Sequence, residues 1–396
     1  MNIDLDLVVG IPSYNEEKTI SFVTRQVDKG ISKYFSPEKS LIIDADGGST
    51  DNTKKVFMNT KTKTKKLFLQ PSDNITGKGC VLKLIFNEIK KNNASIGITV
   101  DADLHSITPE WIKHMALPIK KGYDFSTPLY SRHKYDGTIT NNICYPAVVG
   151  LFGKNIRQPI GGDFSFSNKI VNYWLEQKWY PSTYKFGIDI FMTLNAVLGH
   201  FKVSETNLLA KKHKPSAPNL CPMFLQVVGT LFNVILDNNE KWLNGDFRDD
   251  MITSVPVFGF KGCEEPQELD VNPDKVKYNS YKDYISYKDI VEKVLDEKVF
   301  SIIDNMYNNN DIFITDELWV RIFYDFLISY YKTGRKDDII NAFRSMYFAR
   351  VYSFIEETLN LSQKEAEQKI RDQAVLFFKN KNYIRKQLML KTKIKI

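Results

Sequence analysis

The stretch LDLVVGIPSYNEEKTI, residues 5–20, carries the pattern on which the fold prediction rests. An apolar run, Leu5–Ile11, leads through a polar turn into a segment with Ile20 and Val23 at helical spacing. Similar short runs return at Leu41–Ile43, Leu67–Gln70 and Ile96–Val100. The chain between these runs is long enough for a helix each time. This repetition predicts an α/β fold, a Rossmann-like and mainly parallel sheet with flanking helices.

The last third of the chain has a different composition and predicts a helical appendage. From about Asp270 the sequence is rich in Asn, Asp, Lys and Tyr. Thr315 is placed to cap one helix, and Ser362 with Glu365 has the spacing of a capping box for another. For the 396 residues we therefore expect an α/β domain over 1–265 and a helical C-terminal region over 266–396.

Composition favours an ordinary globular protein. Hydrophobic residues make up 43% and charged residues 26% of the chain, which excludes collagen-like, disordered and coiled-coil classes. The four cysteines lie far apart, without metal-type spacing, and the first residues lack the basic segment of a signal peptide. No apolar run reaches the roughly 18 residues of a membrane span. We expect a cytoplasmic protein without stable membrane insertion.

The net charge of +7 is concentrated near the C-terminus. Between Lys379 and Ile396 there are seven basic residues and no acidic one. A second basic stretch, Lys54–Lys66, holds six lysines and no acid. Basic termini of this kind are typical of solvated, fraying chain ends, so we expect no nucleic-acid partner.

Two polar turns follow the first two predicted strands. Pro12–Glu17 comes after the first strand, and the glycine-containing segment Asp44–Thr53 comes after the second. Ligands of open parallel sheets bind outside the carboxyl ends of the strands. Carboxylates beside glycines can accept hydrogen bonds from a base and a ribose. The two turns together favour a nucleotide site, and two capped helix starts are the alternative.

Asp101 and Asp103 are the strongest indication of chemistry. They end the fourth predicted strand at positions i and i+2, which puts both carboxylates on one face of an extended segment. Such a pair is costly unless a cation lies between its members, and oxygen ligands favour Mg²⁺ or Mn²⁺. We expect a divalent metal that bridges to a diphosphate. Solvated loop acids are the alternative.

Other polar residues could complete this site. Lys78, just before the third predicted helix, is placed for a diphosphate, and His213, in a run of lysines, could complete the shell of the metal. Asp163 could accept sugar hydroxyls, and Asp189 could face the same cleft. The stretch Arg132–Asn142 combines an arginine with hydroxyl groups, as in sites for a small carboxylate or phosphate. An ordinary surface loop is the alternative for each.

In this order the motifs resemble those of GT-A glycosyltransferases. PSYNEE, DGGSTDNT, GKG and DAD are followed by GID and KKH, and the DAD looks like the metal-binding DxD motif of that fold. More narrowly, RHKYDGTIT followed by RQPIGGDF resembles the mannosylglycerate synthase and glucosyl-3-phosphoglycerate (or glucosylglycerate) synthase group. The resemblance covers roughly residues 5 to 225, and the helical last third is compatible with it.

The resemblance implies a role for each candidate residue. The base and ribose would be held by Pro12, Tyr14, Glu16 and Asp46. The diphosphate would be held by Lys78, the sugar or ribose hydroxyls by Asp101, the hexose by Asp163 and Asp189, and the metal by Asp103 and His213. The acceptor carboxylate would be held by Arg132, Thr138, Thr140 and Asn141. Asp101, Lys78 and Asp189 are thereby the implied catalytic residues.

The implied reaction transfers glucose or mannose, with retention of configuration, from UDP-glucose, GDP-glucose or GDP-mannose to D-glycerate or 3-phosphoglycerate. The product would be a glycosylglycerate, an anionic compatible solute. The Gly-Arg-Val-Thr acceptor loop of the glucosyl-3-phosphoglycerate synthases is absent, and YDGTIT is more similar to the type that takes unphosphorylated glycerate. A homodimer is implied by the resemblance alone.

Two other functions are compatible with these motifs. An inverting GT-A enzyme that acts on a polyprenyl phosphate or a glycan would need a catalytic base, for which Asp163 and Asp189 are the candidates. A sensor that binds a nucleotide sugar without turnover would need the same pocket but no catalysis.

Overall fold

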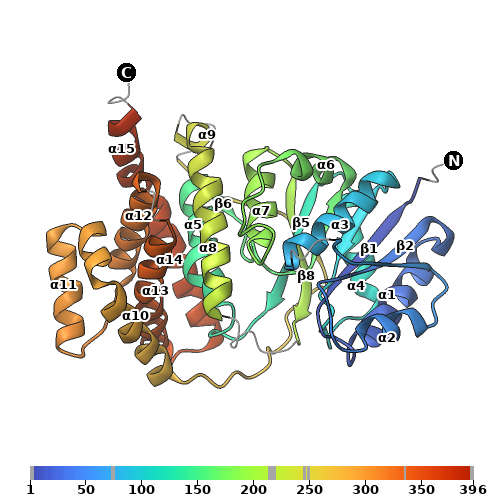
Figure 1. Cartoon of the computed structure of the whole chain (residues 1–396), viewed down its shortest axis with the longest axis horizontal. Helices are drawn as coiled ribbons and strands as arrows, with labels where there is room; N and C mark the ends of the chain where they lie inside the picture. The colour runs from blue at the N-terminus through green and yellow to red at the C-terminus, as the bar shows by residue number, and fades with distance from the viewer. Residues whose placement is uncertain are drawn as a thin grey trace. The chain divides into compact units, whose positions relative to one another are not determined.

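The computed structural model describes residues 4–72, 76–212, 220–243, 247, 250–333 and 336–392. The strands, shown in Figure 1, are β1 (Leu7–Ser13), β2 (Ser40–Asp46), β3 (Lys65–Leu69), β4 (Ile96–Thr99), β5 (Phe125–Ser131), β6 (Lys154–Asn155), β7 (Phe164–Ser167), β8 (Val203–Ala210), β9 (Thr253–Ser254) and β10 (Val257–Gly259). The first helices are α1 (Ile20–Tyr34), α2 (Thr53–Asn59), α3 (Lys78–Lys91), α4 (Pro109–Lys120), α5 (Tyr145–Phe152), α6 (Asn168–Glu176) and α7 (Ile188–Leu198). They are followed by α8 (Leu220–Asp237), α9 (Asn239–Leu243), α10 (Pro273–Val294), α11 (Glu297–Asn308), α12 (Asp316–Lys332), α13 (Lys336–Thr358), α14 (Gln363–Lys379) and α15 (Lys381–Thr392).

The mainly parallel sheet predicted from the sequence is confirmed. Within the described residues eight strands form one sheet, in the order β10-β8-β5-β7-β4-β1-β2-β3. Neighbouring strands are parallel except at β7, which runs antiparallel to both β4 and β5. The amino end of β7 therefore lies at the same sheet edge as the carboxyl ends of β1, β2, β4, β5 and β8.

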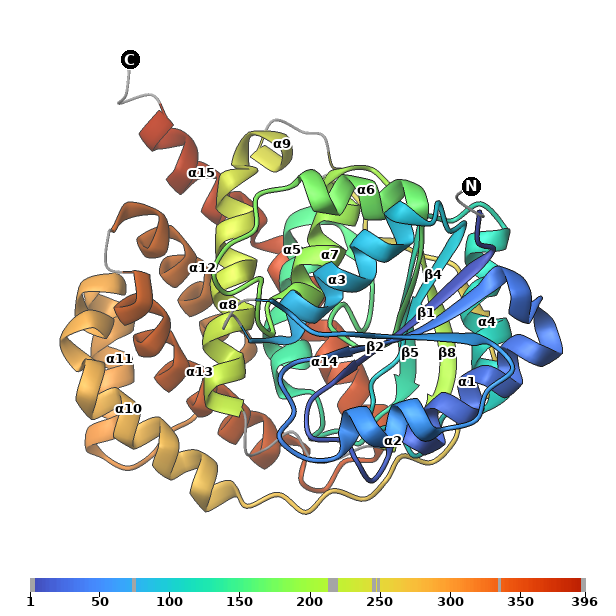
Figure 2. The same ribbon diagram turned by 45° about the vertical axis from the view of Figure 1, so that its right-hand side comes forward.

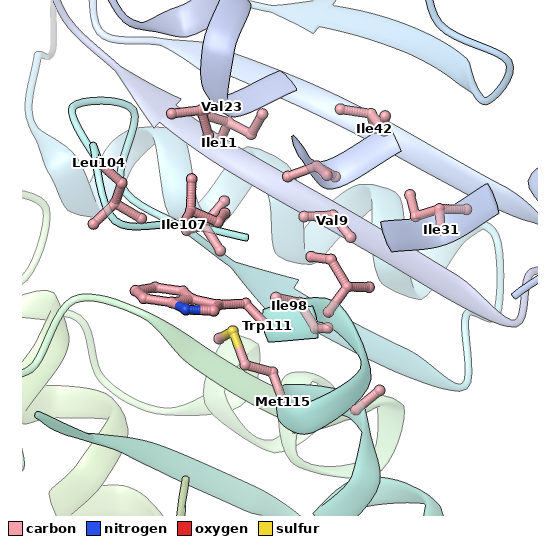
Figure 3. Close-up of a cluster of buried hydrophobic side chains, with 14 of the residues drawn as sticks. Val9, Ile11, Val23, Ile31, Ile42, Ile98, Leu104, Ile107, Trp111 and Met115 are labelled. Carbon is pink, nitrogen blue, oxygen red and sulfur yellow. The ribbon is translucent and has the colours of Figure 1, made fainter. Parts of the chain in front are cut away.

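Helices cover both faces of this sheet (Figure 2). On one face, Val9 and Ile98 pack with Trp111 and Met115 of α4, as Figure 3 shows, and these side chains are fully buried or nearly so. On the other face, the Ile85 side chain of α3 lies directly over Gly10. Burying a large apolar side chain contributes about 1.5–3 kcal/mol. The two apolar faces thus fix the strands whose ends carry the candidate residues.

The chain divides into two compact units. The first contains Met1–Arg132, Ile156–Thr230 and Val255–Gln267, and it holds the eight-stranded sheet. The second contains His133–Asn155, Leu231–Ser254 and Glu268–Ile396. A helical C-terminal region is present as expected, but the second unit also takes in 133–155 and 231–254, which the predicted boundary at 265 assigned to the α/β domain.

The packing of α5 explains why these earlier residues join the C-terminal helices. Tyr145 and Val149 of α5 belong to one buried cluster with Ile370 of α14. At Gly150 the absence of a side chain lets α5 approach α14, because a Cβ atom there would lie 2.7 Å from the Cβ of Phe377. An apolar face of α5 is thus buried by residues more than 200 positions later in the sequence, a contact that local patterns do not reveal.

The predicted helix caps of the second unit are present. The Thr315 hydroxyl accepts a hydrogen bond from the amide of Leu318 at the start of α12. Ser362 and Glu365 form the reciprocal capping box at the start of α14. Each cap satisfies helix amides that would otherwise lack a partner and contributes about 1 kcal/mol.

The basic C-terminal segment is more ordered than expected. Residues 381–392 form α15, in which Lys381 and Arg385 are buried. The Arg385 guanidinium donates to the carbonyl of Trp242 at 2.7 Å. The interpretation of the whole tail as solvated and fraying is therefore wrong for this helix, although Lys379 just before it is exposed.

One described helix has the length and apolar composition of a membrane span. It is α8, with a mean hydropathy of 1.6 over 18 residues, 56% of which are buried inside the structure. The sequence expectation of no such segment has to be amended to this extent. Core helices of soluble proteins have the same properties, so α8 alone is weak evidence for a membrane span.

The turn before α3 is fixed by a distant segment. The amides of Gly79 and Cys80 donate to the carbonyls of Lys185 and Tyr184 at 3.1 and 3.0 Å. A Cβ atom on Gly79 would lie 1.9 Å from the carbonyl oxygen of Thr183. Because these two amides of α3 already have backbone partners, the Lys78 side chain is the stronger candidate at this turn to bind an anion.

We expect Gly79→Ala to lower the free energy of unfolding by about 1–3 kcal/mol, because the added methyl group overlaps backbone that cannot move aside freely. Gly47→Ala is the control, since its Cβ atom would meet the nearest atom at an ordinary 3.4 Å. Urea unfolding followed by circular dichroism measures both changes. Equal stability of the two variants would contradict the close contact.

Candidate active site

The candidate residues gather at one edge of the sheet because the strand directions bring them there. Asp46 ends β2, Asp101 follows β4, and Lys211 follows β8, all at carboxyl ends. Asp163 directly precedes β7, whose reversed direction puts its amino end at this same edge. The edge is the position at which open α/β sheets bind ligands.

Asp46 shapes the turn that follows β2. Its Oδ1 accepts hydrogen bonds from the amides of Gly48 and Ser49 at 2.8 and 2.7 Å. Its side chain is buried, with the Ser13 hydroxyl 3.4 Å from Oδ2. Direct contact with a base, the role that the resemblance implies, stays a prediction; the observed role of Asp46 is to hold the glycine turn in place.

The two polar turns are joined to each other. Asn15 donates its amide to the Ser49 hydroxyl at 2.7 Å and accepts from the Thr50 amide at 2.9 Å. The Glu16 amide donates to the Thr53 hydroxyl at 2.8 Å. These bonds make one rigid rim from two loops that are more than 30 residues apart in sequence.

The side chain of Tyr14, at the edge of this rim, is exposed to solvent. The residue is 59% exposed and lies beside the half-buried Pro12 and Glu16. The Glu16 carboxylate accepts a hydrogen bond from the Thr19 hydroxyl at 2.9 Å, and this bond holds the carboxylate at the turn that precedes α1. An exposed aromatic ring next to carboxylates is a suitable surface for stacking a planar base.

Lys78 is shared between two carboxylates. Its ammonium lies 3.3 Å from Oδ1 of Asp101 and 3.3 Å from Oδ2 of Asp189. Asp189 is in the first turn of α7, and its Oδ1 is buried without a hydrogen-bond partner among the described residues. The motifs GKG, DAD and GID, widely separated in sequence, therefore meet at one point.

Asp163 lies behind Asp101 and has no exposed side-chain surface. Its Oδ1 accepts the backbone amide of Asp101 at 2.8 Å, and its Oδ2 accepts the Tyr130 hydroxyl at 2.6 Å. Lys211 donates to Asp163 at 2.7 Å and to Asp101 at 2.8 Å. Both oxygens of Asp163 are thus in use, which gives it a positioning role here; direct contact with the hexose stays a prediction.

The glycines before Asp163 serve this cluster. A Cβ atom on Gly162 would lie 2.5 Å from Oδ2 of Asp101, and Gly162 has a φ of +93°. The Gly161 carbonyl accepts a further hydrogen bond from Lys211 at 3.2 Å. The backbone of this glycine pair thus lies close to Asp101 and Lys211.

Burial and neighbouring charges shift the pKa values of this cluster in opposing directions. Burial would lower the pKa of Lys78 and Lys211, but neighbouring aspartates, Asp101 first, raise both above the ordinary value. Burial raises the pKa of Asp163 and Asp189, against the opposing effects of Lys211 and Lys78. Burial and Asp163 also raise the pKa of Tyr130, so its hydroxyl stays protonated and donates. Three carboxylates face two ammonium groups.

The predicted metal ligands are described only in part. Asp103 is half-buried at the end of the DAD motif, whereas His213 lies outside the described residues. Among the residues that the structure describes, no group of three or more His, Cys, Asp or Glu side chains is arranged for a metal. The carbonyl of Lys212, however, accepts a hydrogen bond from the amide of His105 at 2.9 Å. Lys212 therefore lies next to the residues that follow Asp103.

The predicted acceptor residues belong to both units. Arg132, in the first unit, donates to Gln158 at 3.1 Å and lies over the Tyr130 ring. In the second unit the Thr138 hydroxyl is 2.6 Å from that of Tyr347, Asn141 donates to the carbonyl of Asp136 at 3.0 Å, and Thr140 is buried. Their common role in binding an acceptor remains a prediction.

Sequence reasoning missed three residues of this site. Lys211 was noted only as part of a basic cluster around His213, and nothing local marks Tyr130. Asp44 was read as part of a turn, yet it is a fully buried strand residue. The alternation of β2 offered a signal, because Asp44 falls on the same face as the core residue Ile42.

Comparison with known proteins gives similarity of structure only. No protein-family model and no curated protein matches the chain. Among solved structures, the chain is similar to glucosyl-3-phosphoglycerate synthase from Mycobacterium tuberculosis in complex with Mn²⁺, UDP and phosphoglyceric acid, with 20% identity, 58% of this chain and 78% of that chain covered, and a TM-score of 0.48. The same enzyme with Mg²⁺ and UDP gives 20% identity, coverage of 58% and 79%, and a TM-score of 0.47.

Asp44 generates a prediction about stability. Its Oδ1 accepts the Ser13 hydroxyl at 2.6 Å, and its buried Oδ2 has no partner among the residues that the structure describes. Burial, with a further contribution from Asp46, raises the pKa of Asp44 to about 7, from an ordinary value of 3.8. Because the folded state holds this proton more tightly than the unfolded state, the contribution of Asp44 to stability falls as the pH rises from about 4 to 7.

Asp44→Asn removes this titration. Relative to wild type, we expect the variant to gain up to about 4 kcal/mol of unfolding free energy between pH 4 and pH 8. Urea unfolding across that range measures the difference, with the exposed Asp6→Asn as the control. A difference between variant and wild type that stays constant with pH would show that Asp44 is ionised throughout.

Proposed function

We propose that this protein is a metal-dependent retaining glycosyltransferase that moves glucose or mannose from a nucleotide sugar to D-glycerate or 3-phosphoglycerate. The observation that carries the proposal is the convergence of Lys78, Asp101 and Asp189 at the carboxyl edge of the sheet, the edge at which β1 leads into the turn with the exposed Tyr14. We infer that this edge supplies a surface for a base, a cation for a diphosphate and carboxylates for sugar hydroxyls.

Each group has a distinct task in the transfer. Tyr14 and the rim would bind the base, and the Lys78 ammonium would hold the diphosphate and stabilise the negative charge that grows on it as the glycosidic bond breaks. Asp101 and Asp189 would accept hydroxyl hydrogens and orient the hexose. A divalent metal held by Asp103 and His213 would supply further neutralisation of the leaving diphosphate.

The enclosure of Asp163 supports retention over inversion. An inverting enzyme needs a base that reaches the acceptor hydroxyl, and Asp163 has both oxygens occupied and no exposed surface. Asp189 keeps one buried oxygen without a partner among the described residues, and burial raises its pKa. Inverting transfer with Asp189 as the base is therefore the second candidate function.

The direct test is a reaction screen. Purified protein with Mg²⁺ or Mn²⁺ is incubated with UDP-glucose, GDP-glucose or GDP-mannose and either D-glycerate or 3-phosphoglycerate, and the product is examined by NMR. We expect an α-linked glycosylglycerate. A β-linked product would identify inversion, diphosphate release without this product would direct attention to glycan or lipid-phosphate acceptors, and no release with any donor would favour a sensor.

The metal ligands give a separate prediction. Asp103→Ala and His213→Ala should each reduce metal-stimulated product formation about 100-fold or more, because the diphosphate would lose its main counter-charge. Activity is titrated with Mn²⁺, and thermal unfolding checks the fold. His105→Ala, at an exposed histidine next to the motif, is the control and should keep its activity. Full activity in either ligand variant would remove that residue from the metal site.

A further inference from the structure

The two lysines of the candidate site differ in how firmly they are held. Lys211 is 4% exposed and makes three short contacts, with Asp101, Asp163 and the Gly161 carbonyl. Lys78 is 15% exposed, and both of its ion pairs are 3.3 Å long. Of the two cations, Lys78 is therefore the one that is held less closely and can turn to a ligand, while Lys211 stays with Asp101 and Asp163.

An exchange at Lys78 affects two carboxylates at once. If the ammonium turns to a diphosphate, Asp189 loses the ion pair of its Oδ2 with Lys78, and its Oδ1 already has no hydrogen-bond partner among the described residues. A buried carboxylate without a partner is strongly unfavourable. Asp101 keeps Lys211 on its other oxygen, so the cost falls mainly on Asp189.

The hexose of a nucleotide sugar can offset the cost of leaving the Asp189 carboxylate without its ion pair, whereas a nucleoside diphosphate cannot. Sugar hydroxyls donate hydrogen bonds to carboxylates, and such charge-assisted bonds are about twice as strong as neutral ones. A nucleoside diphosphate would bind the Lys78 ammonium but has no hydroxyl group at the position of the hexose. The difference between the two ligands is therefore concentrated at Asp189.

We propose that Asp189 is a specificity-determining residue that makes the site select the nucleotide sugar over the nucleoside diphosphate, by competing for Lys78 whenever the hexose is missing. The proposal rests on the proposed glycosyltransferase function and adds a selection step to it. Asp189 thereby opposes inhibition by the nucleoside diphosphate product and assists its release, because reforming the pair with Lys78 displaces the diphosphate.

The test compares the two ligand classes by calorimetry on the full chain with Mg²⁺. The probes are UDP with UDP-glucose and GDP with GDP-mannose. In wild type we expect the nucleotide sugar of the matching base to bind more tightly than its diphosphate. In Asp189→Asn, which removes the competing charge and keeps the shape, the diphosphate should bind about tenfold more tightly, whereas the nucleotide sugar should not gain. The ratio of the two affinities therefore shifts by about tenfold or more.

Two variants separate this effect from general damage. Asp189→Glu keeps the charge that pairs with Lys78, so it should keep the weak affinity of wild type for the diphosphate. Glu110→Gln removes an ion pair with Lys33 elsewhere in the first unit and should leave both affinities unchanged. Thermal unfolding of every variant confirms the fold.

The outcomes are distinguishable. Equal changes for diphosphate and nucleotide sugar in Asp189→Asn would overturn the selection role while leaving the proposed transferase intact. Wild-type protein that binds the diphosphate more tightly than the sugar would also overturn it, without the need for any variant. Wild-type protein that binds none of the four probes would overturn the proposed function and this inference together.

Discussion

The carboxylate of Asp163 holds together the strands on which the candidate site is built. It accepts a backbone amide at the end of β4, the Tyr130 hydroxyl of β5 and the ammonium of Lys211 after β8. The reversed strand β7 separates β4 from β5, whereas β5 and β8 pair directly, so backbone hydrogen bonds alone do not join the end of β4 to β5. A buried ion contributes to structure only when it is fully paired, and the three partners supply that pairing.

This arrangement explains why one edge can hold several carboxylates close together. Lys211 compensates Asp163 and one oxygen of Asp101, which leaves Lys78 with the other oxygen and with Asp189. Lys211 and Asp163 are the more buried members of this cluster, and Lys78 and Asp189 are the ones that we propose to contact a ligand. The proposed binding of the diphosphate and the proposed selection of the nucleotide sugar then depend on the same group, the Lys78 ammonium, which attracts both a diphosphate and the Asp189 carboxylate.

Local sequence patterns predicted the repeating elements well. The strand runs and the helix caps at Thr315 and Ser362 were correct. The expectation that Asp101 and Asp103 end the fourth strand in an extended segment was wrong, because β4 ends at Thr99 and Asp103 lies in a turn after it. The reversed strand β7 and the packing of α5 on α14 were not predicted, because they depend on contacts between residues far apart in the chain. For the same reason the hydrogen bonds of Asp163 to the Asp101 amide and the Tyr130 hydroxyl were not predicted, because residue type alone does not reveal partners that lie far away in sequence.

The most direct test of the account is a crystal structure of the protein with a nucleotide sugar and a divalent metal. The account predicts the Lys78 ammonium on a diphosphate oxygen, Asp189 within hydrogen-bond distance of a hexose hydroxyl, and Lys211 still between Asp101 and Asp163. A nucleotide sugar bound at this edge with Lys78 still paired to both Asp101 and Asp189, or bound away from these residues, would contradict it.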